Sequence, residues 1–199
     1  DYIQDCGFTA VWLNPINPSS FRDAGYDVTD FYDVAPRYGT LEDYKELCEK
    51  LHTRGMKLIF DLVAGHTSID HPWFVESGKV EKNQYTNRYI WTVSTFDEGE
   101  GIAGLGERDA KCINNFFWSQ PALNYGYAHP NPDKPWELPV EHPDCVAMKQ
   151  ELMKMLDEMG LEWKDFGNYD ATNRDDDYPV YGYKAAKAVA SGECDRGIL

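Results

Sequence analysis

Two short apolar segments separated by a helix pattern constrain the fold of this chain most. The first covers residues 8–13 with the sequence FTAVWL, and the second covers residues 56–63 with MKLIFDLV. Short apolar runs bounded by turn residues are typical of buried strands. Two buried strands joined by a helix predict a βαβ unit in a parallel sheet, and therefore the α/β class.

The segment between the two runs carries the signals of a single helix. Thr40 can cap its first turn, and Asp43 follows at the spacing of a capping box. Gly55 supplies the stop. An apolar stripe at helical spacing lies between them, made of Leu41, Tyr44, Leu47, Cys48 and Leu51.

The pattern changes after the second run. Residues 66–142 show no long periodic helix, but short aromatic pieces, glycine-rich turns near 99–106 and a proline cluster at 130–143. This stretch is far longer than a βα loop of roughly 2 to 6 residues. Its aromatic content argues against disorder, so we expect an inserted subdomain.

Helical periodicity returns at Asp144 and ends at Gly160. We interpret its methionine-rich face as core packing rather than a cofactor site, the face being Cys145, Met148, Leu152, Met155, Leu156 and Met159. Residues 161–199 then lose the apolar pattern of a buried strand. A shifted reading frame and a real but unusual C-terminal segment would each produce this abrupt change.

Composition excludes several classes of partner. The 199 residues carry a net charge of −15, which offers no footprint for nucleic acid or anionic lipid. No apolar run approaches the length of a membrane span, and no signal-peptide pattern opens the chain. The opening DYIQDCGF resembles the middle of a folded segment, so we expect a truncated N-terminus.

The five cysteines are far apart, and none forms a CxxC pair that would suggest zinc or a redox dithiol. We interpret them as reduced, buried residues. A cytoplasmic location is therefore the expectation, with secretion behind a removed signal peptide as the alternative.

Asp61 and His66 form the first candidate pair. Asp61 falls near the C-terminal end of the second run, where barrel enzymes place active-site groups. A carboxylate inside FDLV is costly unless it is paired or hydrogen-bonded. His66 begins the next loop and can turn back over the same end. The alternative is a loop-capping aspartate and a surface histidine, and spacing alone leaves both open.

The second candidate site is the loop at residues 23–40, DAGYDVTDFYDVAPRYGT. It sets Asp23, Asp27, Asp30 and Asp33 among aromatic side chains. One interpretation is a polar, turn-rich loop before a helix. The other is a sugar-binding wall, where carboxylates accept hydrogen bonds from hydroxyls and Tyr26 stacks on a ring.

These motifs, in this order, resemble the α-amylase family of glycoside hydrolases (glycoside hydrolase family thirteen). CGFTAVWLNPI is similar to its second-strand signature, and DAGYDVTDFYDVAPRYGTLEDYKEL to the loop and helix that follow. MKLIFDLVAGHTSIDHPWF is similar to the third strand and first signature region, and SQPALNY to the motif near the end of the inserted domain.

The resemblance covers about residues 1–160 and implies a partial (β/α)8 TIM barrel with an irregular inserted subdomain after the third strand. Residues 1–65 would be the first part of the barrel and residues 66–142 the inserted subdomain. Residues 143–160 would be a barrel helix. Residues 161–199 would be a divergent tail, for which disorder is an alternative.

The resemblance also implies roles for single residues. Tyr26 would stack against the sugar at the cleavage subsite, with Asp23 as a polar support near it. His66 would hydrogen-bond the same sugar. Asp61 would orient the site from the strand end.

The family's retaining mechanism needs an Asp nucleophile, a Glu general acid/base and a further Asp. The nucleophile belongs to a Gly-Phe-Arg-x-Asp pattern, and FGNYDA at residues 166–171 stands at about that place. Asp170 is therefore the candidate nucleophile counterpart, although Asn168 replaces the supporting arginine. The Glu and the further Asp would lie beyond Leu199.

Many members hold calcium through an Asn before the signature His and an Asp in the QPDLN-like motif. Here those positions are Gly65 and Ala122, which supply no side-chain oxygen, whereas calcium takes about 6 to 8 oxygen ligands. We therefore expect the usual calcium site to be lost, and no cofactor.

Together these features predict a fragment of a retaining α-glycoside hydrolase acting on starch-like or malto-oligosaccharide α-glucosidic bonds, inactive as this fragment alone. Its partner would be an α-glucan or oligosaccharide, with no nucleic acid and no membrane. One alternative is a non-catalytic amylase-like protein, such as the ectodomain of a transporter heavy chain. Another is a carbohydrate-binding fragment without turnover.

Overall fold

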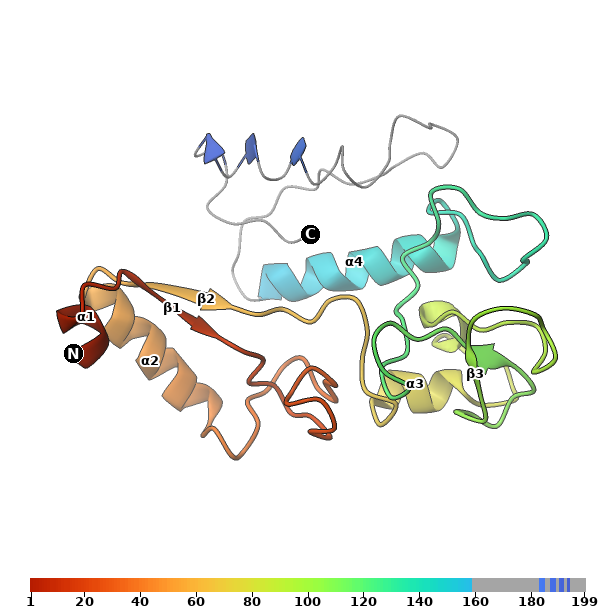
Figure 1. Ribbon diagram of the computed structural model, residues 1–199, viewed down its shortest axis with the longest axis horizontal. Coiled ribbons are helices and arrows are strands. Elements are labelled where there is room, and N and C mark those ends of the chain that lie inside the picture. The colour runs from red at the N-terminus through yellow and green to blue at the C-terminus, as the bar shows by residue number, and fades with distance from the viewer. Residues whose placement is uncertain (159–182, 185–186, 189, 192, 194–199) are drawn as a thin grey trace. The chain divides into compact units, whose positions relative to one another are not determined.

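The computed structural model describes residues 1–158, 183–184, 187–188, 190–191 and 193 (Figure 1). The chain divides into two compact units. The first unit consists of Asp1–Val75 with Asn114–Pro121, and the second unit of Glu76–Ile113 with Ala122–Leu199. No helix among the described residues is both long and apolar enough to cross a membrane.

The first unit is built on the predicted βαβ motif (Figure 1). Strand β1 (Ala10–Leu13) pairs in parallel with β2 (Lys57–Phe60), so that Ala10 lies opposite Lys57 and Leu13 opposite Phe60. Helix α2 (Leu41–Thr53) connects them, and the short helix α1 (Tyr2–Asp5) precedes β1. The parallel pairing is confirmed, whereas each strand is shorter than the apolar run that predicted it.

Helix α2 begins as the sequence predicts. The Thr40 side chain accepts a hydrogen bond from Asp43 N at 3.2 Å, and the Asp43 carboxylate accepts one from Thr40 N at 2.7 Å. These two bonds confirm the capping box. Beyond the helix, Gly55 takes a left-handed φ of 70°, which a residue without a Cβ adopts at little cost.

The core of this motif lies between α2 and one face of the sheet. Leu51, Met56 and Leu58 are buried there, and the side chains packed against them are Val11, Leu13, Tyr44 and Cys48. On the other face Trp12 is 65% exposed and Ile59 39% exposed. The expectation of two fully buried strands is therefore wrong in this structure. Alternate side chains point to opposite faces, and only α2 packs on the sheet among the described elements.

The second unit is irregular except for one long helix. Strands β3 (Ile102–Ala103) and β4 (Lys111–Cys112) pair antiparallel, and η1 (Thr86–Arg88) is a single 3-10 turn. Helix α3 (Pro72–Ser77) has 6 residues and crosses the boundary between the units. The absence of a long helix from residue 66 to residue 142, all of which the structure describes, is confirmed.

Helix α4 (Pro143–Glu158) follows with 16 residues. Its buried side chains are Cys145, Met148 and Met155, as the methionine-rich stripe predicts, while Met159 lies outside the described residues. Within the second unit, Asn87 Nδ2 donates to Asp144 Oδ2 at 2.6 Å and Arg88 Nη2 lies 3.5 Å from Glu151 Oε2. These polar contacts join α4 to the turn η1.

The four cysteines in the described part of the chain are free thiols. Cys6 is exposed and Cys48 is half-buried, whereas Cys112 and Cys145 are buried in the second unit. The prediction that the cysteines are buried is thus confirmed for two of them and wrong for Cys6.

Candidate functional site

The loops that follow β1 and β2 meet in the first unit. Tyr26 Oη donates a hydrogen bond to Asp61 Oδ2 at 2.8 Å. His66 Nε2 lies 2.9 Å from the carbonyl oxygen of Tyr26. Parallel strands deliver their following loops to the same edge of a sheet, and the structure brings these three residues together there.

Asp23 is joined to this group by its backbone, because Tyr26 N donates to the Asp23 carbonyl oxygen at 2.8 Å. Its side chain is held by a residue that the sequence did not single out. Gln120 Nε2 donates to Asp23 Oδ2 at 2.7 Å, and the Gln120 side chain is fully buried. Gln120 comes from the SQPALNY motif, which served above only as a marker of family resemblance. The remaining candidate, Asp170, lies outside the described residues.

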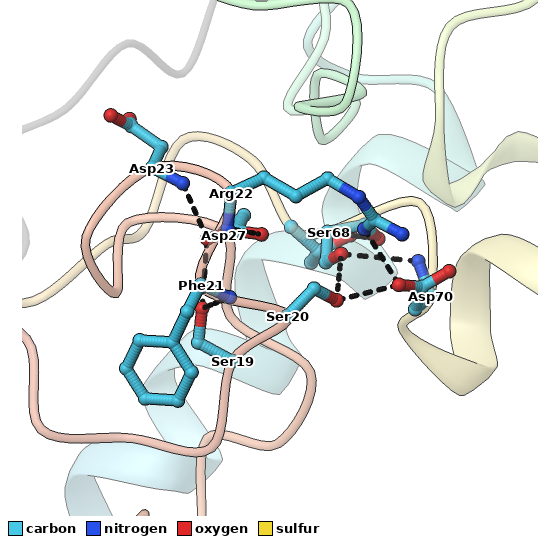
Figure 2. Close-up of polar contacts among 9 residues, drawn as sticks. Ser19, Ser20, Phe21, Arg22, Asp23, Asp27, Ser68 and Asp70 are labelled. Atoms are coloured by element: carbon cyan, nitrogen blue, oxygen red, sulfur yellow. Dashed lines mark hydrogen bonds and ion pairs between the residues drawn. The ribbon is translucent and has the colours of Figure 1, made fainter.

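A buried carboxylate fixes the backbone of the loop after β1. Asp27 is fully buried and accepts hydrogen bonds from Ser19 Oγ at 2.8 Å, Arg22 N at 3.1 Å and Asp23 N at 3.2 Å (Figure 2). Its oxygens are thus directed into the protein. The interpretation of Asp27 as part of a sugar-binding wall is wrong, because water and sugar hydroxyls do not reach it.

Two further aspartates of this loop also serve local turns. Asp30 Oδ1 accepts from Tyr32 N at 2.8 Å, and Asp33 Oδ1 accepts from Val34 N at 2.7 Å. Aspartate commonly binds nearby backbone amides in this way. Asp23 lies close enough to Tyr26 and to His66 for its negative charge to raise the pKa of both groups, and the buried Asp27 acts in the same way on His66.

The turn before Tyr26 depends on a glycine. Gly25 has φ of 107°, and a Cβ at this position would lie 2.9 Å from the carbonyl oxygen of Pro15. Both the left-handed backbone and the close approach exclude a larger residue without movement. Gly25 therefore lets the loop turn tightly enough to present Tyr26 to Asp61.

The protonation states of His66 and Tyr26 follow from their surroundings. Burial holds the pKa of His66 below its usual range, partly offset by the hydrogen bond to the Tyr26 carbonyl. A carbonyl oxygen cannot donate, so Nε2 carries the hydrogen, and the neutral ring leaves Nδ1 facing Asn115 Nδ2 at 3.3 Å. The hydrogen bond to Asp61 raises the pKa of Tyr26, which keeps its hydroxyl protonated as a donor.

The loop at residues 114–121 supplies several neighbours of this group. The Phe116 ring lies edge-on to the His66 ring with centroids 5.7 Å apart. Asn115 Nδ2 donates to Gly65 O at 2.9 Å. The run NNFFW before the SQPALNY motif could have indicated these residues. Consecutive aromatic side chains are uncommon in a simple turn.

The two positions where the family resemblance places calcium ligands carry no side-chain oxygen. Gly65 offers only its carbonyl oxygen, which already accepts from Asn115, and Ala122 is buried without a polar side-chain atom. No group of three or more His, Cys, Asp or Glu side chains among the described residues is placed to hold a metal ion.

Comparisons with known proteins extend these observations. Oligo-1,6-glucosidase of Parageobacillus thermoglucosidasius is 46% identical over 91 residues, which is 46% of this chain and 16% of that protein. Alpha-glucosidase of Schizosaccharomyces pombe is 38% identical over 144 residues, covering 70% of this chain and 25% of that protein. The chain thus spans a quarter or less of the length of these relatives.

The solved structure of the trehalulose synthase MutB from Pseudomonas mesoacidophila MX-45 is similar with a TM-score of 0.63 and 29% sequence identity. The similarity covers 81% of this chain and 28% of that one. The α/β organisation of the described residues is therefore shared with solved enzymes of this kind.

Two family descriptions match different parts of the chain. Residues 142–199 match the family described as Ribose/Galactose Isomerase. Residues 1–159 match the family described as Alpha amylase, catalytic domain, and the two matches overlap on α4. The longer match covers most of the sequence and all of the candidate site described above. The chain therefore belongs to the α-amylase family of glycoside hydrolases.

Proposed function

We propose that this chain carries the sugar-binding part of a retaining α-glycoside hydrolase that acts on starch-like or malto-oligosaccharide α-glucosidic bonds. The observation that carries the proposal is the Tyr26–Asp61 hydrogen bond of 2.8 Å, made beside His66. The two relatives, an oligo-1,6-glucosidase and an alpha-glucosidase, support an α-glucosidic substrate.

In this proposal the side chains bind or position the sugar rather than reacting with it. The Tyr26 ring supplies a flat apolar surface for a pyranose, and its hydroxyl is anchored by Asp61. Asp23 offers a carboxylate to sugar hydroxyls, and the buried His66 fixes the loop that carries Tyr26 through its hydrogen bond to the Tyr26 carbonyl. Fixed polar groups around a ring position it for chemistry without a loss of side-chain freedom on binding.

The reaction of the full enzyme would be retaining cleavage through two carboxyl groups. Asp170 is the counterpart that the family resemblance gives for the nucleophile. We propose that the 199 residues alone do not turn over substrate, because the resemblance assigns no residue of this chain to the general acid/base. The same proposal includes a partial (β/α)8 barrel with an inserted subdomain, no calcium at Gly65 and Ala122, and a cytoplasmic location.

The test is sugar binding by the 199-residue chain, measured by isothermal titration calorimetry with maltose. Replacing Tyr26 by Ala removes the ring and should weaken binding about tenfold or more. The matched control is Tyr38→Ala, because Tyr38 is half exposed on the same loop and takes no part in the Asp61–His66 group. Equal affinities of the two variants would contradict the proposal.

A second candidate function applies to residues 142–199. Their match to the Ribose/Galactose Isomerase family supports a genuine C-terminal segment over a shifted reading frame as the reason why the amylase pattern ends after Gly160. We propose that this segment derives from a sugar isomerase and binds an aldose or ketose by itself. NMR spectra of the chain with ribose and galactose derivatives should then show shifts in residues 142–199 while Tyr26 is unaffected. Shifts confined to the first unit would contradict this second candidate.

A further inference from the structure

Three consecutive aromatic side chains in the first unit face solvent. Phe116, Phe117 and Trp118 are 80%, 52% and 53% exposed. We call residues 116–118 the aromatic loop. Adjacent exposed rings are uncommon on soluble domains unless they form a binding surface, because they leave a large apolar area in contact with water.

The aromatic loop is fixed next to the candidate sugar site. On one side Phe116 contacts the His66 ring, and on the other Gln120 donates to Asp23 at 2.7 Å. The backbone is also held, since Ile69 N donates to Ser119 O at 3.1 Å. The aromatic loop is therefore held against the residues that flank and support Tyr26.

Arg22 restrains the indole of Trp118. Its guanidinium carbon lies 5.9 Å from the centroid of the Trp118 ring, a cation–π distance. The guanidinium is itself fixed, because Nη1 donates to Asp70 Oδ2 at 2.6 Å (Figure 2). Ser20 Oγ donates to the same carboxylate oxygen at 2.6 Å, and these two bonds lower the pKa of Asp70. Arg22 thus reaches Trp118 from an anchored position.

We propose that Trp118 is a stacking platform for a second pyranose ring of the oligosaccharide, next to the ring held by Tyr26 and Asp23. Arg22 is its positioning residue. An indole offers a flat apolar face to the C–H groups of a sugar ring, and a fixed indole loses little freedom on binding. This inference rests on the proposed function, and it adds the prediction that the chain prefers oligosaccharides to a single glucose.

The test compares glucose, maltose and maltotriose by calorimetric titration of the 199-residue chain. Trp118→Ala should lower the affinity for maltose and maltotriose about three- to tenfold and leave the affinity for glucose unchanged. Trp118→Phe should retain part of the affinity. Arg22→Lys keeps a cation for Asp70 but loses the planar stacking group, so it should lower the preference for maltotriose over glucose without abolishing glucose binding.

The control variant is Phe96→Ala, which removes a 90% exposed aromatic ring from the second unit. It should leave all three affinities unchanged. The proposal for Trp118 would be wrong if Trp118→Ala lowered the affinity for none of the sugars. It would also be wrong if the affinity for glucose fell as much as the affinity for maltotriose. A loss of self-association in sedimentation velocity with unchanged sugar affinity would assign the aromatic loop to a second copy of the chain instead, and would also overturn the platform.

The two proposals fail in different ways. Binding that is weakened by Tyr26→Ala but insensitive to Trp118→Ala overturns the platform alone. A chain that binds none of the three sugars overturns both the platform and the proposed function.

Discussion

His66 shows how burial sets the role of one residue in the site. The neutral ring donates from Nε2 to the Tyr26 carbonyl, and burial keeps its pKa low. A histidine in this state supports the loop that carries Tyr26, because the hydrogen bond joins the loops after β1 and β2. Protonation would place a charge in a buried position and weaken that arrangement.

Stability should therefore depend on pH through His66. Its pKa in the folded state lies below the unfolded value of about 6.5, so the unfolded chain binds the proton first as the pH falls. The contribution is fully present above that value and is lost as the pH falls towards the folded-state pKa. Urea unfolding at pH 7.5 and pH 5 should show this loss, and His66→Gln should remove it. A His66→Gln chain that kept the full pH dependence would contradict the assignment, and His52→Gln on α2 is the exposed control.

The site residues divide into those that the sequence could predict and those that it could not. Asp61 and His66 follow one strand and Tyr26 follows another, so strand order alone predicted that they meet. Gln120 is 97 residues from Asp23 in the chain, and no periodicity or local spacing reports such a contact. The buried position of Asp27 could not be predicted either, because the sequence does not distinguish a loop aspartate that faces solvent from one that binds backbone amides.

At the level of elements, the stability contributed by the capping box of α2 can be measured directly. Thr40→Ala removes the acceptor for Asp43 N and should lower the free energy of unfolding by about 1 kcal/mol. Thr40→Ser retains the hydroxyl and should cost much less. Urea denaturation followed by circular dichroism gives both values. If the alanine and serine variants were equally stable, the capping box would contribute nothing.

The sequence predicted helix and strand positions best where interactions between neighbouring residues determine them. The cap at Thr40 and the stop at Gly55 depend on neighbouring residues, so the sequence contains the needed information. The burial of β1 and β2 depends on what packs against the sheet. Trp12 has a strand-forming, apolar side chain and is nevertheless 65% exposed, since its face of the sheet meets no described helix. The β-propensity of a segment indicates that it forms a strand, but not which elements pack against that strand.

For the whole chain, we predict binding without turnover. A chromogenic maltoside should not be hydrolysed by the 199 residues, because binding groups alone contribute little compared with a full set of reacting carboxyl groups. Release of the chromophore is followed by absorbance, with a full-length relative as the positive control. Turnover by the chain that disappears in Asp170→Ala would contradict this prediction and establish Asp170 as the nucleophile.

The distribution of cysteines gives the chain an internal reporter of local opening. Burial raises the pKa of the Cys145 thiol to about 11 and that of the Cys112 thiol further, so neither forms the reactive thiolate while the second unit is closed. Cys6 is exposed and can be blocked first with an alkylating reagent. Later alkylation of Cys112 or Cys145, identified by mass spectrometry of peptides, would then count the openings of the second unit. Comparing the labelling rate with and without sugar would show whether sugar binding to the first unit also slows the opening of the second unit.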